Sequence, residues 1–397
     1  MSSAVPEGWN YSEMQTIVKD YNGSIVDGPF GSNLKTSDYV ETGVPVLQGK
    51  NVTNDRFLWS DVRYITNEKA KELSRSSVRV GDILMVKIGS VGYSAIVDNL
   101  NNFDFAIIPA NLLKIDIDES KAVTKYVHHY MTSPEGKRRI VDEASSTAQP
   151  ALSLGTMKKF RLPIPPLPEQ KKIASILTSV DEVIENTQKQ IDKLQDLKKA
   201  TMNELLTKGI GHTEFKDSEL GRIPKSWEVM KLDQLCSLKY GKSPKEIEVK
   251  DGKYSIYGTG GVVGKTNSFV HLGESIVIGR KGSIDNVSFV RSPFWAIDTT
   301  YYVEGKGTYM KWLFYRLQFE GLRKYNEASG VPSLNRDTLY GIRILTPTKV
   351  EQTEICVVLD SISSQIHMQS KKLVQTQSLK KSLMQDLLTG KVRVSVN

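Results

Sequence analysis

The residues best suited to chemistry in this sequence are polar and cationic side chains in short, glycine-containing loops. Glycine lets a backbone approach phosphate closely, Lys and Arg neutralise it, and Asn, Gln and Arg can hydrogen-bond base edges in the major groove of DNA. We therefore predict that two groups of loop residues contact DNA. The first group is Ser32, Asn33, Lys35, Gln48, Lys50, Asn51, Lys87 and Ser90, and the second is Thr259, Lys265, Asn267, Arg280, Lys281 and Ser283.

Motifs for catalysis are incomplete. Residues 259–266 resemble a phosphate-binding P-loop, but Thr259 stands where the first glycine belongs. Residues 27–30 and 292–295 each lack the second proline of an amino-methyltransferase tetrapeptide. The five histidines show no metal-ligand spacing; they are His128, His129, His212, His271 and His367. The sequence predicts binding, with no catalytic residue and no metal site.

The composition agrees with a polyanionic partner. The 397 residues include 53 Lys and Arg against 45 Asp and Glu, a formal net charge of +8. Hydrophobic residues make up 39%, which excludes general disorder. Only Cys236 and Cys356 occur, which excludes a disulfide scaffold and a cysteine-cluster metal site. No apolar run reaches the roughly 18 residues of a membrane span, so we expect a cytoplasmic protein without a membrane partner.

The chain contains an internal duplication. Residues 150–207 align with residues 332–389 without a gap at an offset of 182, and Glu169-Gln170 matches Glu351-Gln352. Upstream the offset drifts, to 193 for Gly89/Gly282 and to 218 for Trp9/Trp227. Each copy therefore has a variable front part and a tail of fixed length.

The fixed tails are predicted to be long helices at about 168–208 and 350–389. No Gly or Pro occurs at 169–208 or at 350–389, and each stretch is followed by glycine, at Gly209 and Gly390. A helix of 40 residues is roughly 60 Å long and needs a partner, so an antiparallel coiled coil with an approximate two-fold axis is expected. The alternative is two linker helices that never meet. The predicted pairing residues are Ile173, Leu177, Val180, Ile184, Ile191, Leu194, Ile355, Leu359, Ile362, Ile366 and Leu373.

The front parts are predicted to mix strands and helices. Short apolar runs at 43–47, 82–86, 274–278 and 286–290 indicate strands. A helix is expected over 122–143, interrupted near Pro134, and another over 309–325, whose aromatic residues we assign to the core. The predicted fold class is α+β.

Several motifs resemble those of the specificity subunits of type I restriction-modification systems. They are residues 27–32, 166–174, 215–227, 279–282 and 295–300, and the resemblance covers essentially the whole chain. One departure is the start of the second helix, Pro347-Thr348-Lys349-Val350-Glu351-Gln352, which lacks the proline-rich entry of the first.

The resemblance implies two target recognition domains, each reading half of a split double-stranded DNA sequence. These would be residues 1–155 and 212–337, with conserved helical regions at 156–211 and 338–397. It also implies docking of two modification subunits, which carry S-adenosylmethionine and methylate adenine, and of restriction subunits, which are motor-nucleases using ATP and Mg²⁺. The chain itself would bind no cofactor and have no active site. The alternatives are a coiled-coil scaffold that binds proteins and a fused methyltransferase or nuclease.

Overall fold

The computed structural model describes residues 6–29, 31–144 and 151–395. The chain forms two compact units. Unit 1 comprises Met1–Gln188 and Lys371–Asn397, and unit 2 comprises Lys189–Ser370. No helix within the described residues is both long enough and apolar enough to cross a membrane.

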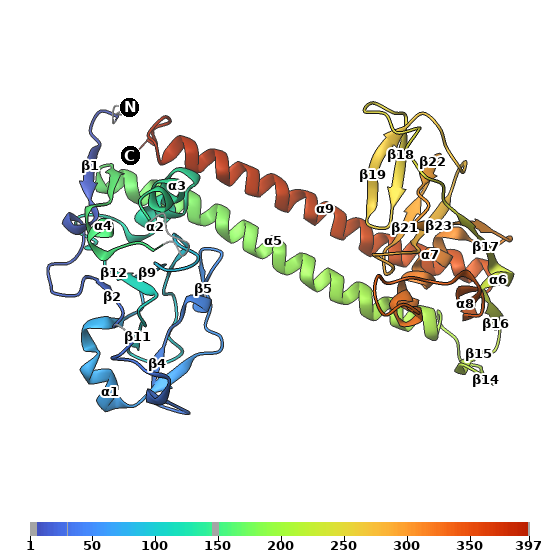
Figure 1. Ribbon diagram of the computed structural model, residues 1–397, viewed down its shortest axis with the longest axis horizontal. Coiled ribbons are helices and arrows are strands. Elements are labelled where there is room, and N and C mark those ends of the chain that lie inside the picture. The colour runs from blue at the N-terminus through green and yellow to red at the C-terminus, as the bar shows by residue number, and fades with distance from the viewer. Residues whose placement is uncertain (1–5, 30, 145–150, 396–397) are drawn as a thin grey trace. The chain divides into compact units, whose positions relative to one another are not determined.

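Two long helices are shared by the units (Figure 1). Helix α5 spans Leu167–Thr207 and helix α9 spans Lys349–Leu387, so each lies within a residue or two of its expected range. Each is followed by a glycine with positive φ, Gly209 at 73° and Gly390 at 70°, which lets the chain leave the helix without the strain another residue would suffer.

Unit 1 is built on two main sheets. One has the strand order β10 (Ser94–Ile96), β9 (Ile83–Val86), β12 (Leu112–Ile115), β2 (Ile25–Asp27). The other has the order β3 (Tyr39–Val40), β7 (Arg63–Ile65), β4 (Val44–Val46), β11 (Ala106–Ile107), β8 (Ser77–Val78). Two strand pairs complete the unit: β1 (Asn10–Glu13) with β13 (Arg161–Ile164), and β5 (Val52–Thr53) with β6 (Arg56–Phe57). Its shorter helices are α1 (Asn67–Glu72), α2 (Thr124–Thr132), α3 (Pro134–Asp142) and α4 (Leu154–Lys159).

Unit 2 repeats much of this plan with fewer strands. Its four-stranded sheet has the order β17 (Cys236–Tyr240), β23 (Thr300–Gly305), β20 (Ser275–Gly279), β21 (Val287–Val290). Its three-stranded sheet has the order β19 (Gly261–Thr266), β18 (Tyr254–Gly258), β22 (Phe294–Ala296). The pairs are β16 (Glu228–Lys231) with β24 (Arg343–Thr346), and β14 (Phe215–Ser218) with β15 (Gly221–Pro224). Its shorter helices are α6 (Leu232–Leu235), α7 (Met310–Glu320) and α8 (Arg336–Tyr340).

The expected elements of the front parts are present. The four predicted strands are β4, β9, β20 and β21. The interrupted helix is the pair α2 and α3, which Ser133 separates by capping α3 with its side chain. In α7, Trp312 and Tyr315 are buried, and Phe314 and Phe319 pack against the same core, as the assignment of these aromatic residues to the core predicted.

The two long helices pack antiparallel within each unit. In unit 1 the start of α5, with Ile173 and Leu177, shares one apolar core with Met384 and Leu387 near the end of α9. In unit 2 the order is reversed, and Leu206 near the end of α5 shares a core with residues near the start of α9, among them Ile355 and Leu359. Two linker helices that never meet are therefore excluded.

Most of the predicted pairing residues are buried, but not all of them. The buried ones are Ile173, Leu177, Ile184, Ile191, Ile355, Leu359 and Ile362. Val180, Leu194, Ile366 and Leu373 are only half-buried.

Candidate nucleic-acid interface

Two of the predicted loops of unit 1 lie side by side. The loop at Gln48–Asn51 follows β4, and the loop at Lys87–Ser90 follows β9. Gly49, Lys50, Gly89 and Ser90 line one surface pocket of about 530 Å³. Tyr93, Asn54 and Asn111 line the same pocket, which therefore offers hydrogen-bonding groups and an aromatic ring beside a lysine. Such a set of groups can contact base edges and phosphate.

Not every predicted residue of these two loops faces outward. Asn51 is fully buried, and its Nδ2 donates to the carbonyls of Leu58 and Ser60, each at 2.8 Å. Its Oδ1 accepts from the backbone N–H of Gln48 at 2.8 Å. Asn51 thus holds the loop together, and this placement revises the expectation that it contacts DNA. The exposed Lys50 pairs with Asp61 at the surface.

The third predicted group in unit 1 is exposed. Ser32, Asn33 and Lys35 all lie on the surface, and the backbone N–H of Lys35 donates to Asp38 Oδ2 at 2.6 Å. The motif before them needs its glycine, because a Cβ on Gly28 would lie 2.1 Å from the backbone of Pro109. Phe30 of that motif is outside the described residues.

Unit 2 brings its two main loops together in the same way. Thr259 occupies the turn between β18 and β19, and Gly282 lies in the loop after β20. A Cβ on Gly282 would lie 3.7 Å from Thr259 Oγ1, so the two loops are neighbours. Lys281 and Ser283 are exposed beside them. Lys265 and Asn267 are also exposed, at the far end of β19, where Asn267 Oδ1 accepts from the N–H of Lys253 at 3.1 Å.

The glycine loop after β9 in unit 1 and the equivalent loop after β20 in unit 2 are held by the same backbone hydrogen bond. In unit 1 the N–H of Leu152 donates to the carbonyl of Lys87 at 2.8 Å, and in unit 2 the N–H of Leu334 donates to the carbonyl of Arg280 at 2.9 Å. The loops sit 193 residues apart and the segments that hold them 182 apart, the two offsets of the duplication. Gly89 and Gly282 both have positive φ, at 87° and 93°. The duplication thus preserves the geometry of this loop as well as its sequence.

Arg280 lies in a cationic and aromatic cluster that sequence reasoning missed in part. Its Nε and Nη2 donate to the carbonyl of Asp298 at 3.2 and 2.9 Å. A guanidinium has five N–H donors, so three remain available for a ligand. The guanidinium lies 5.5 Å from the ring centre of Tyr240, and Arg336 lies 5.1 Å from the same centre. Tyr240 is 47% exposed. Neither Tyr240 nor Arg336 belongs to a glycine-rich loop, so the loop composition that predicts a DNA contact at Arg280 does not predict one at either residue.

Lys87, at the position equivalent to Arg280, is already paired. Its Nζ lies 2.6 Å from Asp27 Oδ2, and both side chains are largely buried. The prediction that Lys87 contacts DNA did not include its partner Asp27, which lies on the distant strand β2.

The start of each long helix is anchored by a duplicated contact. Trp9 Nε1 donates to Glu169 Oε2 at 3.1 Å, and Trp227 Nε1 donates to Glu351 Oε2 at 2.7 Å. All four side chains are buried. In unit 1, Arg393 completes the site with bonds of 2.7 and 2.8 Å to the two oxygens of Glu169.

In unit 2, residues of the segment that follows α5 bind Glu351, as Arg393 binds Glu169 in unit 1. His212 Nε2 lies 2.7 Å from Glu351 Oε1, and the N–H of Ile210 donates to that oxygen at 3.0 Å. Gln170 Nε2 donates to the carbonyl of Pro165, and Gln352 Nε2 to the carbonyl of Pro347. The second helix therefore keeps the entry contacts of the first, although its proline-rich start is lost.

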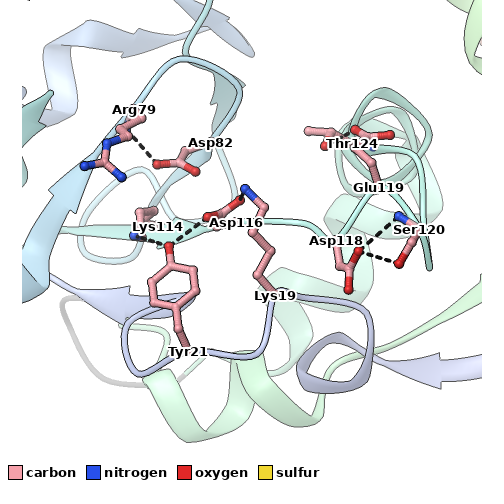
Figure 2. Close-up of polar contacts among 10 residues, drawn as sticks. All are labelled: Lys19, Tyr21, Arg79, Asp82, Lys114, Asp116, Asp118, Glu119, Ser120 and Thr124. Atoms are coloured by element: carbon pink, nitrogen blue, oxygen red, sulfur yellow. Dashed lines mark hydrogen bonds and ion pairs between the residues drawn. The ribbon is translucent and has the colours of Figure 1, made fainter. Parts of the chain in front are cut away.

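A separate polar cluster in unit 1 consists mostly of charged side chains and contains none of the predicted DNA-binding residues (Figure 2). Lys114 and Asp82 are buried there, Lys114 Nζ donates to Tyr21 Oη at 3.0 Å, and Tyr21 Oη donates to Asp116 at 2.7 Å. Burial raises the pKa of Asp82 to about 6 and lowers the pKa of Lys114. A pocket of about 330 Å³ lies over the cluster.

Comparisons with known proteins agree with this arrangement. The sequence pattern of the type I restriction modification DNA specificity domain matches residues 31–196 and again residues 224–376. A sequence of Methanocaldococcus jannaschii assigned as the specificity subunit of type I restriction enzyme MjaX is 26% identical, over 98% of this chain and 95% of its own length. The MjaVIII specificity subunit of the same organism is 30% identical, over 64% and 67%.

Solved structures share the fold. The S subunit of a type I restriction-modification system from M. genitalium superposes with a TM-score of 0.66 at 16% identity, over 98% of both chains. A chain from a study of complex assembly in the type I R-M system superposes with a TM-score of 0.55 at 14% identity, over 98% of this chain and all of its own. With the specificity-domain pattern present twice, the chain belongs to the family of type I restriction-modification DNA specificity subunits.

Proposed function

We propose that this specificity subunit reads a split DNA target, with one half-site contacted by the paired loops of each unit. In unit 1 the reading loops are those at Gln48–Lys50 and Gly89–Ser90, and in unit 2 those at Thr259 and Arg280–Ser283. Their glycines allow close approach to the DNA backbone, while their Arg, Gln and hydroxyl groups match base edges.

The observation that carries the proposal is the matched geometry of the two units. Loops from distant parts of the sequence meet in each unit, and the same backbone hydrogen bond holds the glycine loop in both. A scaffold that binds two unrelated proteins would have no need for the same anchored, cation-bearing loop twice.

The chain itself recognises the DNA sequence and catalyses no reaction. Its relatives are specificity subunits, and the P-loop and methyltransferase motifs in its sequence are incomplete. Two modification subunits that bind S-adenosylmethionine would methylate adenine, and restriction subunits that use ATP and Mg²⁺ would cleave DNA. The long helices α5 and α9 would provide the surface on which these partners assemble, in the cytoplasm.

The test is methylation sequencing of a host that expresses the chain with its modification subunits. We expect a single two-part adenine-methylated motif with a spacer of fixed length. Exchanging the loop at residues 279–283 for a loop from a relative with a different target should alter the half-site read by unit 2 and leave the other half intact. A change in both half-sites, or in neither, would contradict the division of reading between the units. Methyl transfer by the purified chain alone would contradict its non-catalytic role.

A further inference from the structure

Strand register identifies equivalent positions in the two units. In unit 1, Met85 of β9 pairs with Leu113 of β12, which pairs in turn with Asp27 of β2. In unit 2, Ile278 of β20 pairs with Tyr301 of β23, which pairs with Tyr240 of β17. Met85 and Ile278 are related by the offset of 193 found in the glycine loops. Tyr240 therefore occupies in unit 2 the place that Asp27 occupies in unit 1.

This exchange changes the charge at the end of the strand. In unit 1 the carboxylate of Asp27 neutralises Lys87 at 2.6 Å. In unit 2 the equivalent Arg280 meets an uncharged aromatic ring in place of the carboxylate. Among the described residues, no carboxylate lies within ion-pair distance of Arg280, whose only protein acceptor is the backbone carbonyl of Asp298.

A second arginine adds to the same unneutralised charge. Arg336 stands at the offset-182 position of Leu154, so unit 1 has no cation there. The Arg336 guanidinium lies 5.1 Å from the ring centre of Tyr240 and 6.0 Å from that of Tyr340. No described residue forms an ion pair or hydrogen bond with it, and its Nε is buried without an acceptor. The interaction with the two rings is favourable but cannot cancel the charge.

Two guanidinium groups beside one exposed ring repel each other unless an anion lies between or over them. The neighbouring loop at Gly282 is the part of unit 2 proposed above to contact DNA, whose backbone carries one negative charge per nucleotide. We infer that Arg336 binds a DNA phosphate next to Arg280, with Tyr240 holding the two side chains in place, and that unit 1 has no equivalent phosphate contact. The inference rests on the proposed function and deepens it, because it makes the two units electrostatically unequal.

The experiment measures binding of the full chain to duplex DNA of arbitrary sequence by fluorescence anisotropy, over a range of salt concentrations. Each phosphate contact adds about 0.9 to the slope of log K against log salt concentration. Arg336→Gln should lower the magnitude of that slope by about 0.9, whereas Arg336→Lys should retain it. Lys87→Gln in unit 1 should leave the slope unchanged, because Asp27 already neutralises that lysine.

Arg323→Gln is the matched control within unit 2. This arginine is exposed and lies 3.5 Å from Asp285, so its charge is already paired and the slope should not change. Arg336→Met, which keeps an apolar stem against Tyr240 and Tyr340, replaces Arg336→Gln if the latter lowers the melting temperature. An unchanged slope in a folded Arg336→Gln or Arg336→Met variant overturns the inference, and so does an equal loss in Lys87→Gln. A wild-type chain that shows no DNA binding overturns the proposed function itself.

Discussion

At the level of single residues, neighbouring side chains in one loop are expected to have different tasks. Arg280 keeps a free fork of N–H donors, which matches two acceptors on a guanine edge, whereas Lys281 is an exposed point charge on a flexible stem. The loop after β20 therefore combines a group suited to reading sequence with a group suited to binding phosphate.

Arg280→Ala should weaken binding to the cognate sequence by about 1–3 kcal/mol and relax specificity in one half-site only. Lys281→Ala should weaken binding to all sequences alike and reduce the salt slope by roughly one. Competition binding with duplexes that differ at single positions measures both effects. If neither half-site preference nor salt dependence changes, the loop has a structural role.

The buried carboxyl of Asp82 makes unit 1 sensitive to pH. Its folded-state pKa of about 6 lies above the unfolded value near 3.9. Its protonated form therefore stabilises the fold fully below the unfolded pKa, and this contribution of up to roughly 3 kcal/mol is lost as pH rises through 6. Asp82→Asn cannot ionise and should not show this loss, so its stability relative to wild type should increase between pH 4 and 7. A difference in unfolding free energy that stays constant over this range would contradict the shifted pKa.

At the level of elements, the duplication allows a core substitution and its control to be made at matched positions. Leu177 and Leu359 are equivalent and fully buried, one in each unit, whereas Leu197 and Leu379 are equivalent and about half exposed. Leu177→Ala and Leu359→Ala should each cost about 2–5 kcal/mol, because each leaves a cavity in a packed core. Leu197→Ala and Leu379→Ala should cost well under 1 kcal/mol. Denaturant unfolding measures all four, and equal costs at buried and exposed positions would contradict the assigned packing.

The elements could largely be predicted from the sequence because the signals are local or duplicated. The two long helices followed from 40-residue stretches without Gly or Pro, and their antiparallel pairing from the gapless register. The glycine loops followed from residue type and from their recurrence at matching places. Four predicted pairing residues are only half-buried, because the spacing of apolar residues along a helix does not specify how wide its contact with the partner helix is. They are Val180, Leu194, Ile366 and Leu373.

The side-chain contacts of the site that the sequence does not predict have a common cause. The partner of Lys87 is Asp27, 60 residues away in sequence, and the partner of Arg280 is Tyr240, 40 residues away. These pairs form because β12 and β23 each lie between two other strands, and strand order and register are not encoded in the loop itself. Asn51 was misjudged for a related reason, since its amide is taken up by carbonyls that a later turn supplies.

At the level of the whole molecule, both long helices run from one unit to the other, so their length is expected to determine the spacer between half-sites. Inserting four residues after Lys193 in α5, and four at the matched position after Gln375 in α9, lengthens both helices by about one turn, or roughly 6 Å. DNA rises about 3.4 Å per base pair, so the preferred spacer should lengthen by about one to two base pairs. The half-site bases should stay the same, because the loops are untouched.

Methylation sequencing with the insertion variant and its modification subunits measures the new spacer. A single insertion after Lys193 alone is the control, and it should lower thermal stability because α5 and α9 no longer match in length. A folded double-insertion variant that methylates only the original spacing would disprove the idea that the helices set the spacer. Altered half-site bases would mean that the helices take part in reading sequence.

The make-up of unit 1 also has a consequence for protein synthesis. Its core contains Met384 and Leu387 from the last turn of α9 and Leu388 directly after the helix, whereas unit 2 is one continuous stretch, Lys189–Ser370. The chain emerges from the ribosome with its N-terminus first, at about 5–20 residues per second, and domains generally fold as units. Unit 2 can therefore form its core before Met384, Leu387 and Leu388 have been added to unit 1 and before Arg393 can bind Glu169. A premature stop just after residue 370 would leave the later-made unit complete and the earlier-made one with an open core, exposed to proteases and chaperones.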